Sequence, residues 1–276
     1  MVQGDIADSE NNFQCLGSSQ LPIAHGGQDE GPKKTPETDA IFDNVWHVNA
    51  LADADPETLR ISMDTKATVH VGEYSRGGQS RGLEPVKALD HDMRPKEKLV
   101  PGGILEPVTG RAFLFYTGSN KTSDFLVDGL LLWWNERQRD LSDVRRIVIN
   151  VDNGPECSGH RSQFLLRMAQ FADMTQLTVR IIYYPPYHSK YNAIERYWGG
   201  LEKSWNGYLL GTVNAVLNRS ANFLWKGLRA TVRLLDAVYE KGIKLCKKEN
   251  KELEQPLERS PGLPWYDITI KPNMVC

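Results

Sequence analysis

Three acidic residues stand where strands or helices are expected to begin or end. Asp64 ends the alternating segment 59–63, Asp152 follows the β-branched run 147–151, and Glu195 opens a helical stretch. Carboxylates without Cys or His partners suit a hard cation such as Mg²⁺ or Mn²⁺. Two such ions about 3.5–4 Å apart can activate an attacking hydroxyl and stabilise the leaving oxygen of a phosphodiester. The pattern therefore indicates metal-dependent phosphoryl-transfer chemistry.

Each of these acids also has a purely structural interpretation, because Asp at a strand end often caps a helix or closes a turn. Glu156 and Glu202 compete for the place of the third ligand, and Glu202 lies two helical turns after Glu195 on a similar face. Reactive groups of open α/β sheets gather at the carboxyl ends of strands. Only the joint placement of the three acids favours catalysis.

The segments between the acids alternate between strand and helix patterns. Strands are expected at 59–64, 68–74, 111–117, 147–151 and 178–184, and helices from Thr38, at 123–139, at 158–173 and around 194–205. The proline-containing stretch 82–110 is expected to be a loop. This order predicts an α/β fold, a mixed sheet flanked by helices.

Composition divides the chain into three parts. Residues 1–37 are polar and poor in aromatics, which predicts a disordered or loosely ordered leader. Residues 38–250 are expected to form the catalytic domain, with an N-terminal helix and a helical, basic extension over 222–250. Residues 251–276 are expected to be an irregular tail.

Bulk properties exclude several classes of protein. The 276 residues contain four cysteines that are far apart, so neither a zinc site nor a disulfide scaffold is expected. No apolar stretch approaches the roughly 20 residues that span a bilayer, which excludes a membrane protein. The net charge of -2 does not mark a nucleic-acid-binding domain. A local basic rim can nevertheless coexist with it.

Two segments carry a specific resemblance. Residues 151–156 (Val-Asp-Asn-Gly-Pro-Glu), followed by His160, resemble the strand-end "DN…H" of DDE transposases. Residues 184–198 (Tyr-Pro-Pro-Tyr-His-Ser-Lys-Tyr-Asn-Ala-Ile-Glu-Arg-Tyr-Trp) resemble their "PPYSP…NPIExxW" signature, with Ala193 in place of the usual Pro. Ala tolerates the helical geometry that Pro preorganises, so this departure is mild. So many matched positions make the signal far more specific than a lone short motif.

The first-acid region extends the resemblance. Residues 61–67 and 74–78 are similar to the corresponding region of the ISAzo-type bacterial insertion-sequence transposases, distant relatives of the mariner-like group. The match runs with few breaks from about Pro36 to Pro272. It covers most of the chain.

This resemblance implies an RNase H-like, retroviral-integrase-like fold. Asp64 would lie on the first strand, Asp152 at the end of the fourth, and Glu195 on the helix after the fifth, together holding two Mg²⁺ (or Mn²⁺) ions. It implies a DNA transposase that cleaves phosphodiesters at the transposon ends and transfers the strand to target DNA. Its partners would be DNA and further copies of itself, with no membrane. Its place would be the bacterial cytoplasm, at the nucleoid when bound to DNA.

Basic residues near the acids are candidates for contacts with the DNA backbone, which dominates affinity for DNA. They are Lys66, Arg76, Arg81, His188, Lys190 and Arg196. Solvated surface is the alternative for each, and His188 is expected in an exposed loop. Among supporting residues, Asn153 could hold Asp152 or close a turn, and His160 could position a phosphate or an acid, or cap and pack.

Two other functions remain open at this stage. No helix-turn-helix pattern precedes the catalytic segment, so the chain could be a catalytically incompetent, truncated transposase fragment without its DNA-recognition domain. It could also be an RNase H-like nuclease that cuts without strand transfer. The intact set of acids argues against the first alternative, and the 184–198 signature argues against the second.

Overall fold

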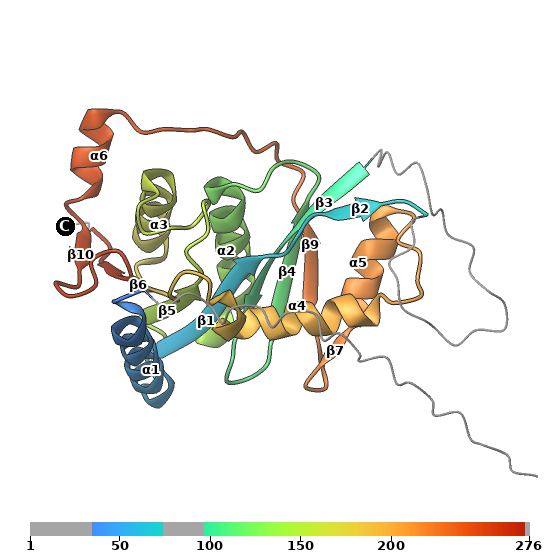
Figure 1. The fold of residues 1–276 in the computed structure, drawn as a ribbon, viewed down its shortest axis with the longest axis horizontal. Helices are drawn as coiled ribbons and strands as arrows, with labels where there is room; N and C mark the ends of the chain where they lie inside the picture. Colours follow the sequence, from blue (N-terminus) through green and yellow to red (C-terminus); the bar gives the residue numbers. More distant parts are fainter. Residues whose placement is uncertain (1–34, 74–96, 274–276) are drawn as a thin grey trace, which may run out of the picture. The chain divides into compact units, whose positions relative to one another are not determined.

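A nine-stranded mixed sheet forms the centre of the computed structural model (Figure 1), which describes residues 35–73 and 97–273. The helices are α1 (Thr38–Ala54), α2 (Ser123–Arg137), α3 (Ser162–Thr175), α4 (Ala193–Ser204), α5 (Val213–Asn222) and α6 (Lys247–Leu253). The strands are β1 (Thr58–Thr65), β2 (Val69–Val71), β3 (Glu97–Leu105), β4 (Ala112–Thr117), β5 (Arg146–Val151), β6 (Thr178–Tyr183), β7 (Leu224–Trp225), β8 (Leu228–Arg229), β9 (Thr231–Leu234), β10 (Leu257–Arg259) and β11 (Asp267–Ile270).

The strand order of the main sheet is β10-β11-β6-β5-β1-β3-β4-β9, with β2 paired to β3. Strands β1, β3 and β4 form an antiparallel meander, whereas β5 and β6 run parallel to β1. Helix α2 connects β4 to β5, α3 connects β5 to β6, and α4 follows β6. The order β4-β3-β1-β5-β6 with these connections is the RNase H-like arrangement, which confirms the predicted fold class.

Helices cover both faces of the sheet (Figure 1). On one face, Ile61 and Met63 of β1 share a core with α2 and α3. On the opposite face, α1 packs on Val148 and Ile182, and α4 and α5 cover the meander. Successive side chains of a strand point to opposite faces. The even-numbered residues of β1 therefore face the layer that contains α4.

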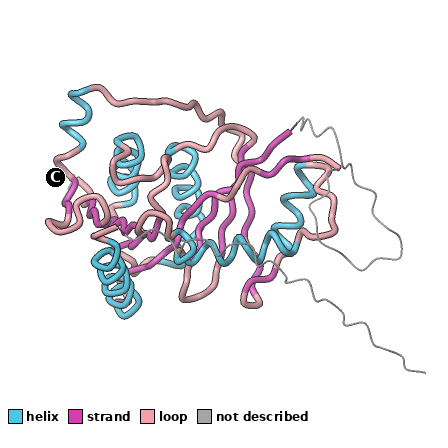
Figure 2. Tube along the Cα trace, viewed as in Figure 1, coloured by secondary structure: helices cyan, strands magenta, loops and turns pink. Residues whose placement is uncertain are grey.

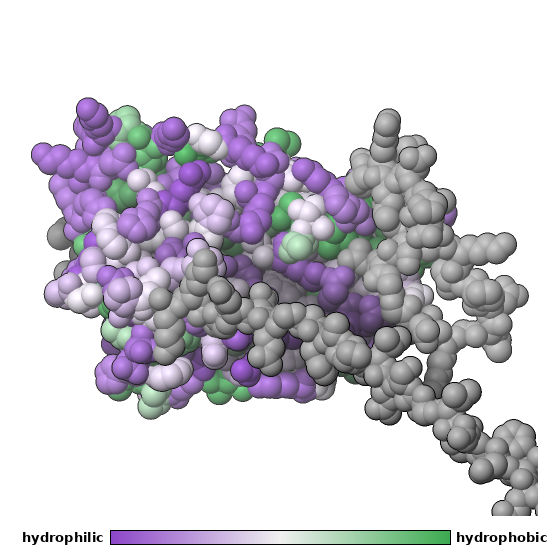
Figure 3. Space-filling model, viewed as in Figure 1, coloured by the Kyte–Doolittle hydropathy of each residue, from purple (hydrophilic) through white to green (hydrophobic). Residues whose placement is uncertain are grey.

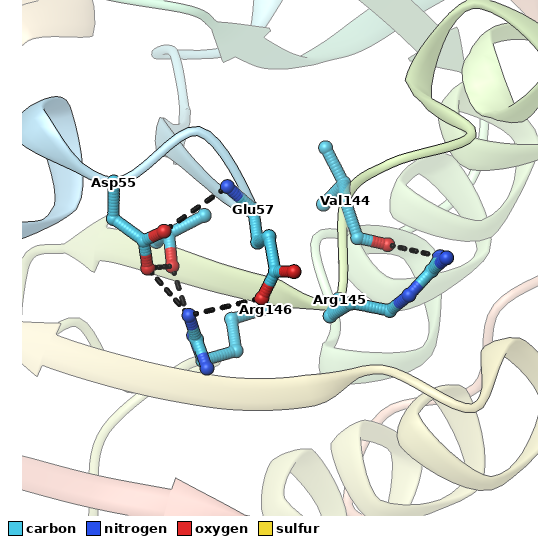
Figure 4. A network of polar contacts seen from close by, with 6 residues as sticks. Asp55, Glu57, Val144, Arg145 and Arg146 are labelled. Carbon is cyan, nitrogen blue, oxygen red and sulfur yellow. Dashed lines mark hydrogen bonds and ion pairs between the residues drawn. The ribbon is translucent and has the colours of Figure 1, made fainter.

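A polar network fixes the ends of β1 and β5 that lie away from the acids (Figure 4). The Asp55 carboxylate accepts hydrogen bonds from the Thr58 hydroxyl at 2.6 Å and from Arg146 Nη2 at 2.6 Å. The Glu57 carbonyl accepts from the backbone N–H groups of Arg145 at 2.8 Å and Arg146 at 3.1 Å. These bonds hold the two strands in one register along their length.

The prediction of a loop over 82–110 is wrong for its last part, because β3 occupies residues 97–105. Proline normally argues against a central strand because it lacks an N–H group. The carbonyl of Pro101 accepts from the Lys66 N–H at 3.0 Å, so the proline nitrogen faces the same side. On that side the partner of β3 changes from β2, paired at Leu99, to β1, paired at Gly102. The missing donor therefore falls in a gap between two ladders.

The C-terminal predictions are also wrong. Most of the expected helix over 222–250 is replaced by the β7–β8 hairpin, strand β9 and an irregular segment over 235–246 that appears as a long loop in Figure 2. Only its last residues are helical, in α6, which starts at Lys247. The turn residues Lys226 and Gly227 have φ of 49° and 80°, a conformation typical of a two-residue hairpin turn. The tail expected to be irregular contains β10 and β11, and β11 pairs with the free edge of β6. Strand β9 pairs with the edge of β4, and β11 pairs with the edge of β6. Neither pairing is visible in the local sequence.

The face shown in Figure 3 is mainly hydrophilic, with small hydrophobic areas between polar ones. In the described part of the chain, none of the helices has the length and apolar character needed to cross a membrane.

Candidate active site

The register of two neighbouring strands brings the first two acids together. In the parallel β1–β5 pair, Ser62 lies opposite Asn150. Two residues further along both strands are Asp64, within β1, and Asp152, directly after β5. Neighbouring strands lie about 4.8 Å apart, and residues in register point to the same face. The structure therefore places Asp64 beside Asp152 at the carboxyl ends of adjacent strands.

Glu195 is held above this pair by a hydrogen-bonded attachment of helix α4 to strand β1. The Ser62 hydroxyl donates to Asn192 Oδ1 and accepts from the Ile194 N–H at 2.9 Å. Asn192, which is fully buried, also donates to the Met63 carbonyl at 3.4 Å. These bonds join the start of α4 to the segment that ends in Asp64. Ser62 and Asn192 thus position Glu195, and sequence analysis did not identify either of them.

A glycine in β3 allows α4 to lie close to the sheet. Gly103 pairs with Asp64 across the β1–β3 ladder. A Cβ atom at Gly103 would lie 2.6 Å from the Trp198 ring and 3.0 Å from the Ile194 side chain, so no side chain fits there without movement. Trp198 is buried. Close packing at Gly103 keeps the first turn of α4, with Glu195, near Asp64.

The three acids share one electrostatic environment. Burial raises the pKa of Asp64 well above its usual value, and the charges of Asp152 and Glu195 raise it further. The pKa of Asp152 is raised by burial and by the charge of Glu156. Burial also raises the pKa of Glu195, while a hydrogen bond with Asp64 opposes that shift. Asp64 therefore keeps its proton to a higher pH than an ordinary aspartate does. Mutual influence of this kind occurs only between carboxylates that lie close together.

A fourth carboxylate and a lysine belong to the same cluster. Glu156, 7% exposed, accepts a hydrogen bond from the Thr65 hydroxyl at 2.9 Å. Its Oε1 also lies 2.5 Å from the Nζ of Lys121. Burial lowers the pKa of Lys121, but the hydrogen bond and charge of Glu156 outweigh it and raise that pKa overall. Sequence analysis listed Glu156 only as a competing ligand and missed Lys121, which stands in no recognisable motif.

The donors present suit a divalent cation in chemistry, although they are not arranged around one. Asp64, Asp152 and Glu195 offer only carboxylate oxygens, the ligands preferred by Mg²⁺ and Mn²⁺. Within residues 35–73 and 97–273, no three His, Cys, Asp or Glu side chains have the geometry to enclose an ion.

The predicted DNA-contacting residues lie in different environments. The Lys66 ammonium pairs with Glu202 of α4 and lies 5.5 Å from the centre of the Trp205 ring, so its charge is already compensated. Lys190 and Arg196 are exposed, before and within the first part of α4. The predicted contacts Arg76 and Arg81 lie outside the described residues. Glu202, the competing third ligand, serves as the partner of Lys66.

The expectation that His188 lies in an exposed loop is wrong. The side chain is 4% exposed, and its Nδ1 is 2.7 Å from the Pro186 carbonyl oxygen. Its ring packs edge-on against Phe42 of α1 and stacks with Tyr191. Burial between α1 and the 185–191 segment leaves little ring surface for DNA. His188 instead fixes the loop that leads to Glu195.

The two supporting candidates have separate surroundings. Asn153 lines a pocket of about 310 Å³ together with Asp152, Pro186 and Tyr187, and its buried Oδ1 has no hydrogen-bond partner among the described residues. His160 is exposed and stacks on Trp265 with ring centres 4.0 Å apart, so its packing role is the one visible. The larger pocket of about 790 Å³ lies beside β2 and β3 and is lined by none of the three acids.

The fold and the acid cluster define an RNase H-like catalytic domain with a three-carboxylate site. The chain belongs to the family described as Rhodopirellula transposase DDE domain, whose model matches residues 25–272. It is therefore a transposase catalytic domain, as the sequence predicted.

Solved structures similar to this chain are complexes of the Mos1 transposase. The Mos1 paired-end complex with left transposon end has 11% identity and a TM-score of 0.43, over 73% of this chain and 57% of that one. The mariner Mos1 paired-end complex with Mg has 11% identity and a TM-score of 0.45, over 75% and 63%. The chain thus spans less than two thirds of Mos1. A comparison with curated protein sequences finds no match.

Proposed function

We propose that this domain cleaves DNA at transposon ends and joins the freed 3′-hydroxyl to target DNA in a reaction that depends on Mg²⁺ or Mn²⁺. Asp64, Asp152 and Glu195 would hold two ions. When bound, such ions activate an attacking hydroxyl and stabilise the leaving oxygen. The observation that carries the proposal is the register of β1 and β5, which sets Asp64 beside Asp152 under the attached end of α4.

The residues of the chain contribute orientation and proton handling. Ser62 and Asn192 keep the start of α4, which carries Glu195, over the strand ends. Burial raises the pKa values of Asp64 and Glu195, and any proton held by these carboxylates must leave when both become ligands. Metal binding should therefore release protons and weaken as the pH falls. The exposed Lys190 and Arg196 beside α4 offer charges for the DNA backbone.

The partners in this proposal are the DNA of the element ends, the target DNA and further copies of the chain. Support comes from the family, which is a transposase family; the similar solved structures are Mos1 complexes with a transposon end, Mg and Mn. We propose residues from about 38 onward as the catalytic unit. Strands β10 and β11 are included because they complete its sheet.

The test is nicking of DNA that carries the ends of the encoding element, in EDTA, Mg²⁺ and Mn²⁺. Asp64→Asn, Asp152→Asn and Glu195→Gln should each abolish metal-dependent nicking while folding and DNA binding persist. Glu202→Gln, on the same helix, is the matched control and should still nick. Folded wild type that binds metal but does not cut would favour a catalytically incompetent domain. Nicking that survives Asp152→Asn would exclude the assigned site, and cutting without strand transfer would favour a simple nuclease.

A further inference from the structure

Lys121 is held at the acid cluster by the two residues that follow it. Thr122 caps helix α2 by accepting from the Phe125 N–H at 3.2 Å, and the Ser123 hydroxyl donates to the Glu156 carbonyl at 2.6 Å. The backbone beside Lys121 is thereby fixed to the segment that follows Asp152. Its ammonium lies 2.5 Å from the Glu156 carboxylate. The fixed backbone and the ion pair thus hold the flexible Lys121 side chain beside Glu156.

The exposure of this pair is uneven. The Glu156 side chain is 6% exposed, whereas the Lys121 side chain is 41% exposed. The carboxylate lies inside and also accepts from Thr65, the residue after Asp64. The ammonium has three N–H donors, and among the described residues its ion pair with Glu156 uses one of them. At the edge of the acid cluster, the exposed part of the Lys121 ammonium can therefore donate further hydrogen bonds to a bound group. Lys66 differs, since its side chain is 14% exposed and pairs with Glu202.

The charge of Lys121 reaches all three proposed ligands. It opposes the rise in the pKa values of Asp64, Asp152 and Glu195. A group bound between the three acids and the solvent would consequently meet Lys121.

Charge balance shows what that group should be. The four carboxylates and Lys121 carry a formal charge of about -3, and two divalent ions would bring the cluster to about +1. One phosphodiester, with a single negative charge, neutralises it. Without Lys121 the loaded cluster would be neutral and would lack net attraction for a phosphate. The lysine thus contributes a positive charge that favours a phosphate, and its ammonium supplies the N–H donors for a direct contact.

From this placement we propose that Lys121 binds the phosphate group at which the DNA is cut, its ammonium donating to a non-bridging oxygen while Glu156 holds it in position. This inference rests on the proposed function and adds a phosphate-binding residue that sequence analysis did not contain. The competing explanation is purely structural: Lys121 would only compensate the buried charge of Glu156. The two differ in whether Lys121 senses the charge of the cleaved phosphate.

These explanations can be separated by changing Lys121 in the protein and the cleaved phosphate in the DNA, singly and together, and comparing the affinities. Two duplexes carrying the element end would be compared, one natural and one with an uncharged methylphosphonate at the cleaved position. Affinities would be measured by fluorescence anisotropy in Ca²⁺. Wild type should bind the methylphosphonate duplex about tenfold more weakly, whereas Lys121→Met should bind both duplexes alike. The slope of log affinity against log salt should also fall by about 1 in the variant. Lys121→Arg should partly restore the discrimination.

Two further variants show whether a loss of discrimination could come from misfolding. Lys121→Met leaves a buried carboxylate without its cation, so the double variant Lys121→Met/Glu156→Gln removes both charges and should fold. It keeps the net charge of the wild-type cluster but lacks the ammonium, so it should still fail to discriminate because the direct contact with the phosphate is lost. Lys248→Met, on the distant α6, should discriminate as wild type does. If both Lys121 variants keep the tenfold discrimination, Lys121 is structural and the inference is overturned while the proposed function stands. If wild type neither binds the ends nor cuts them with Mg²⁺, the proposed function fails and this inference fails with it.

Discussion

Replacing one acid of the site should stabilise the metal-free protein. Asp64 is 7% exposed and lies beside Asp152 and Glu195, whose charges oppose its ionisation. Two full charges about 5 Å apart, at an effective dielectric constant of about 20, repel by roughly 3 kcal/mol. Since Asp64 keeps its proton over part of the pH range, only part of this repulsion is realised. We expect Asp64→Asn to raise the free energy of unfolding by about 1–3 kcal/mol in EDTA at pH 8, and Tm by about 2–10 °C.

The pH dependence gives the sign of this effect. The folded-state pKa of Asp64 is raised above its unfolded value, so the folded protein holds more protons between the two pKa values. Stability therefore falls as the pH rises through that window. The advantage of Asp64→Asn should be largest at pH 8, smaller at pH 5, and absent near the unfolded-state pKa of about 3.9. Urea and thermal unfolding at several pH values would measure it.

A matched control has the opposite expected sign. Asp267 is 3% exposed but is paired through two hydrogen bonds with Arg180, at 2.9 and 2.7 Å. Asp267→Asn makes the same chemical change and should destabilise the fold by about 2–4 kcal/mol, toward the low end because Arg180 is partly exposed. In Mg²⁺, wild type should gain stability and Asp64→Asn should not. The reasoning is refuted if Asp64→Asn is less stable than wild type in EDTA at pH 8, or if its advantage is the same at pH 5.

Four further substitutions test how the site is built. Ser62→Ala or Asn192→Ala should lower stability by about 1–3 kcal/mol by leaving buried groups unpaired, and calorimetry should show a loss of Mn²⁺ affinity that a surface change lacks. Gly103→Ala should cost about 1–3 kcal/mol and reduce nicking, since its Cβ would lie 2.6 Å from the Trp198 ring; unchanged unfolding curves would contradict that close packing. Tyr187→Gly should raise stability by about 1 kcal/mol in urea unfolding, because Tyr187 has φ of 66° and is 75% exposed; a loss would mean that its side chain stabilises the loop.

Local sequence determined the centre of the fold. The runs that became β1, β5 and β6 and the periodic segments that became α2, α3 and α4 are visible because their hydrophobic periods depend only on neighbouring residues. The RNase H-like fold and the transposase family were predicted as well, since the 151–156 and 184–198 segments carry specific residue patterns. The roles of Asp64, Asp152 and Glu195 stay predictions, although the structure brings these residues together.

Long-range packing decided what the sequence could not show. Strand β3 contains Pro101 and two glycines, and it is a strand because its partners on both sides tolerate them. Strands β9 and β11 form because β4 and β6 leave free edges, a condition that lies far away in sequence. His188 is buried because α1, about 140 positions earlier, supplies Phe42. The hydrophobic period of a segment contains no information on such contacts between residues far apart in sequence.

The surroundings of the acids follow the same division. The sequence supplied the carboxylates, but the attachment of Ser62 to Asn192 spans 130 positions, and the Thr65–Glu156 bond spans 91. Lys121 stands beside no motif and acquires its place only when α2 is capped against the segment after β5. Hydrogen bonds and ion pairs depend on distances in space, which only the folded chain defines. The sequence therefore determined which carboxylates could react. The tertiary structure decided which side chains position these carboxylates and which side chain balances their charge.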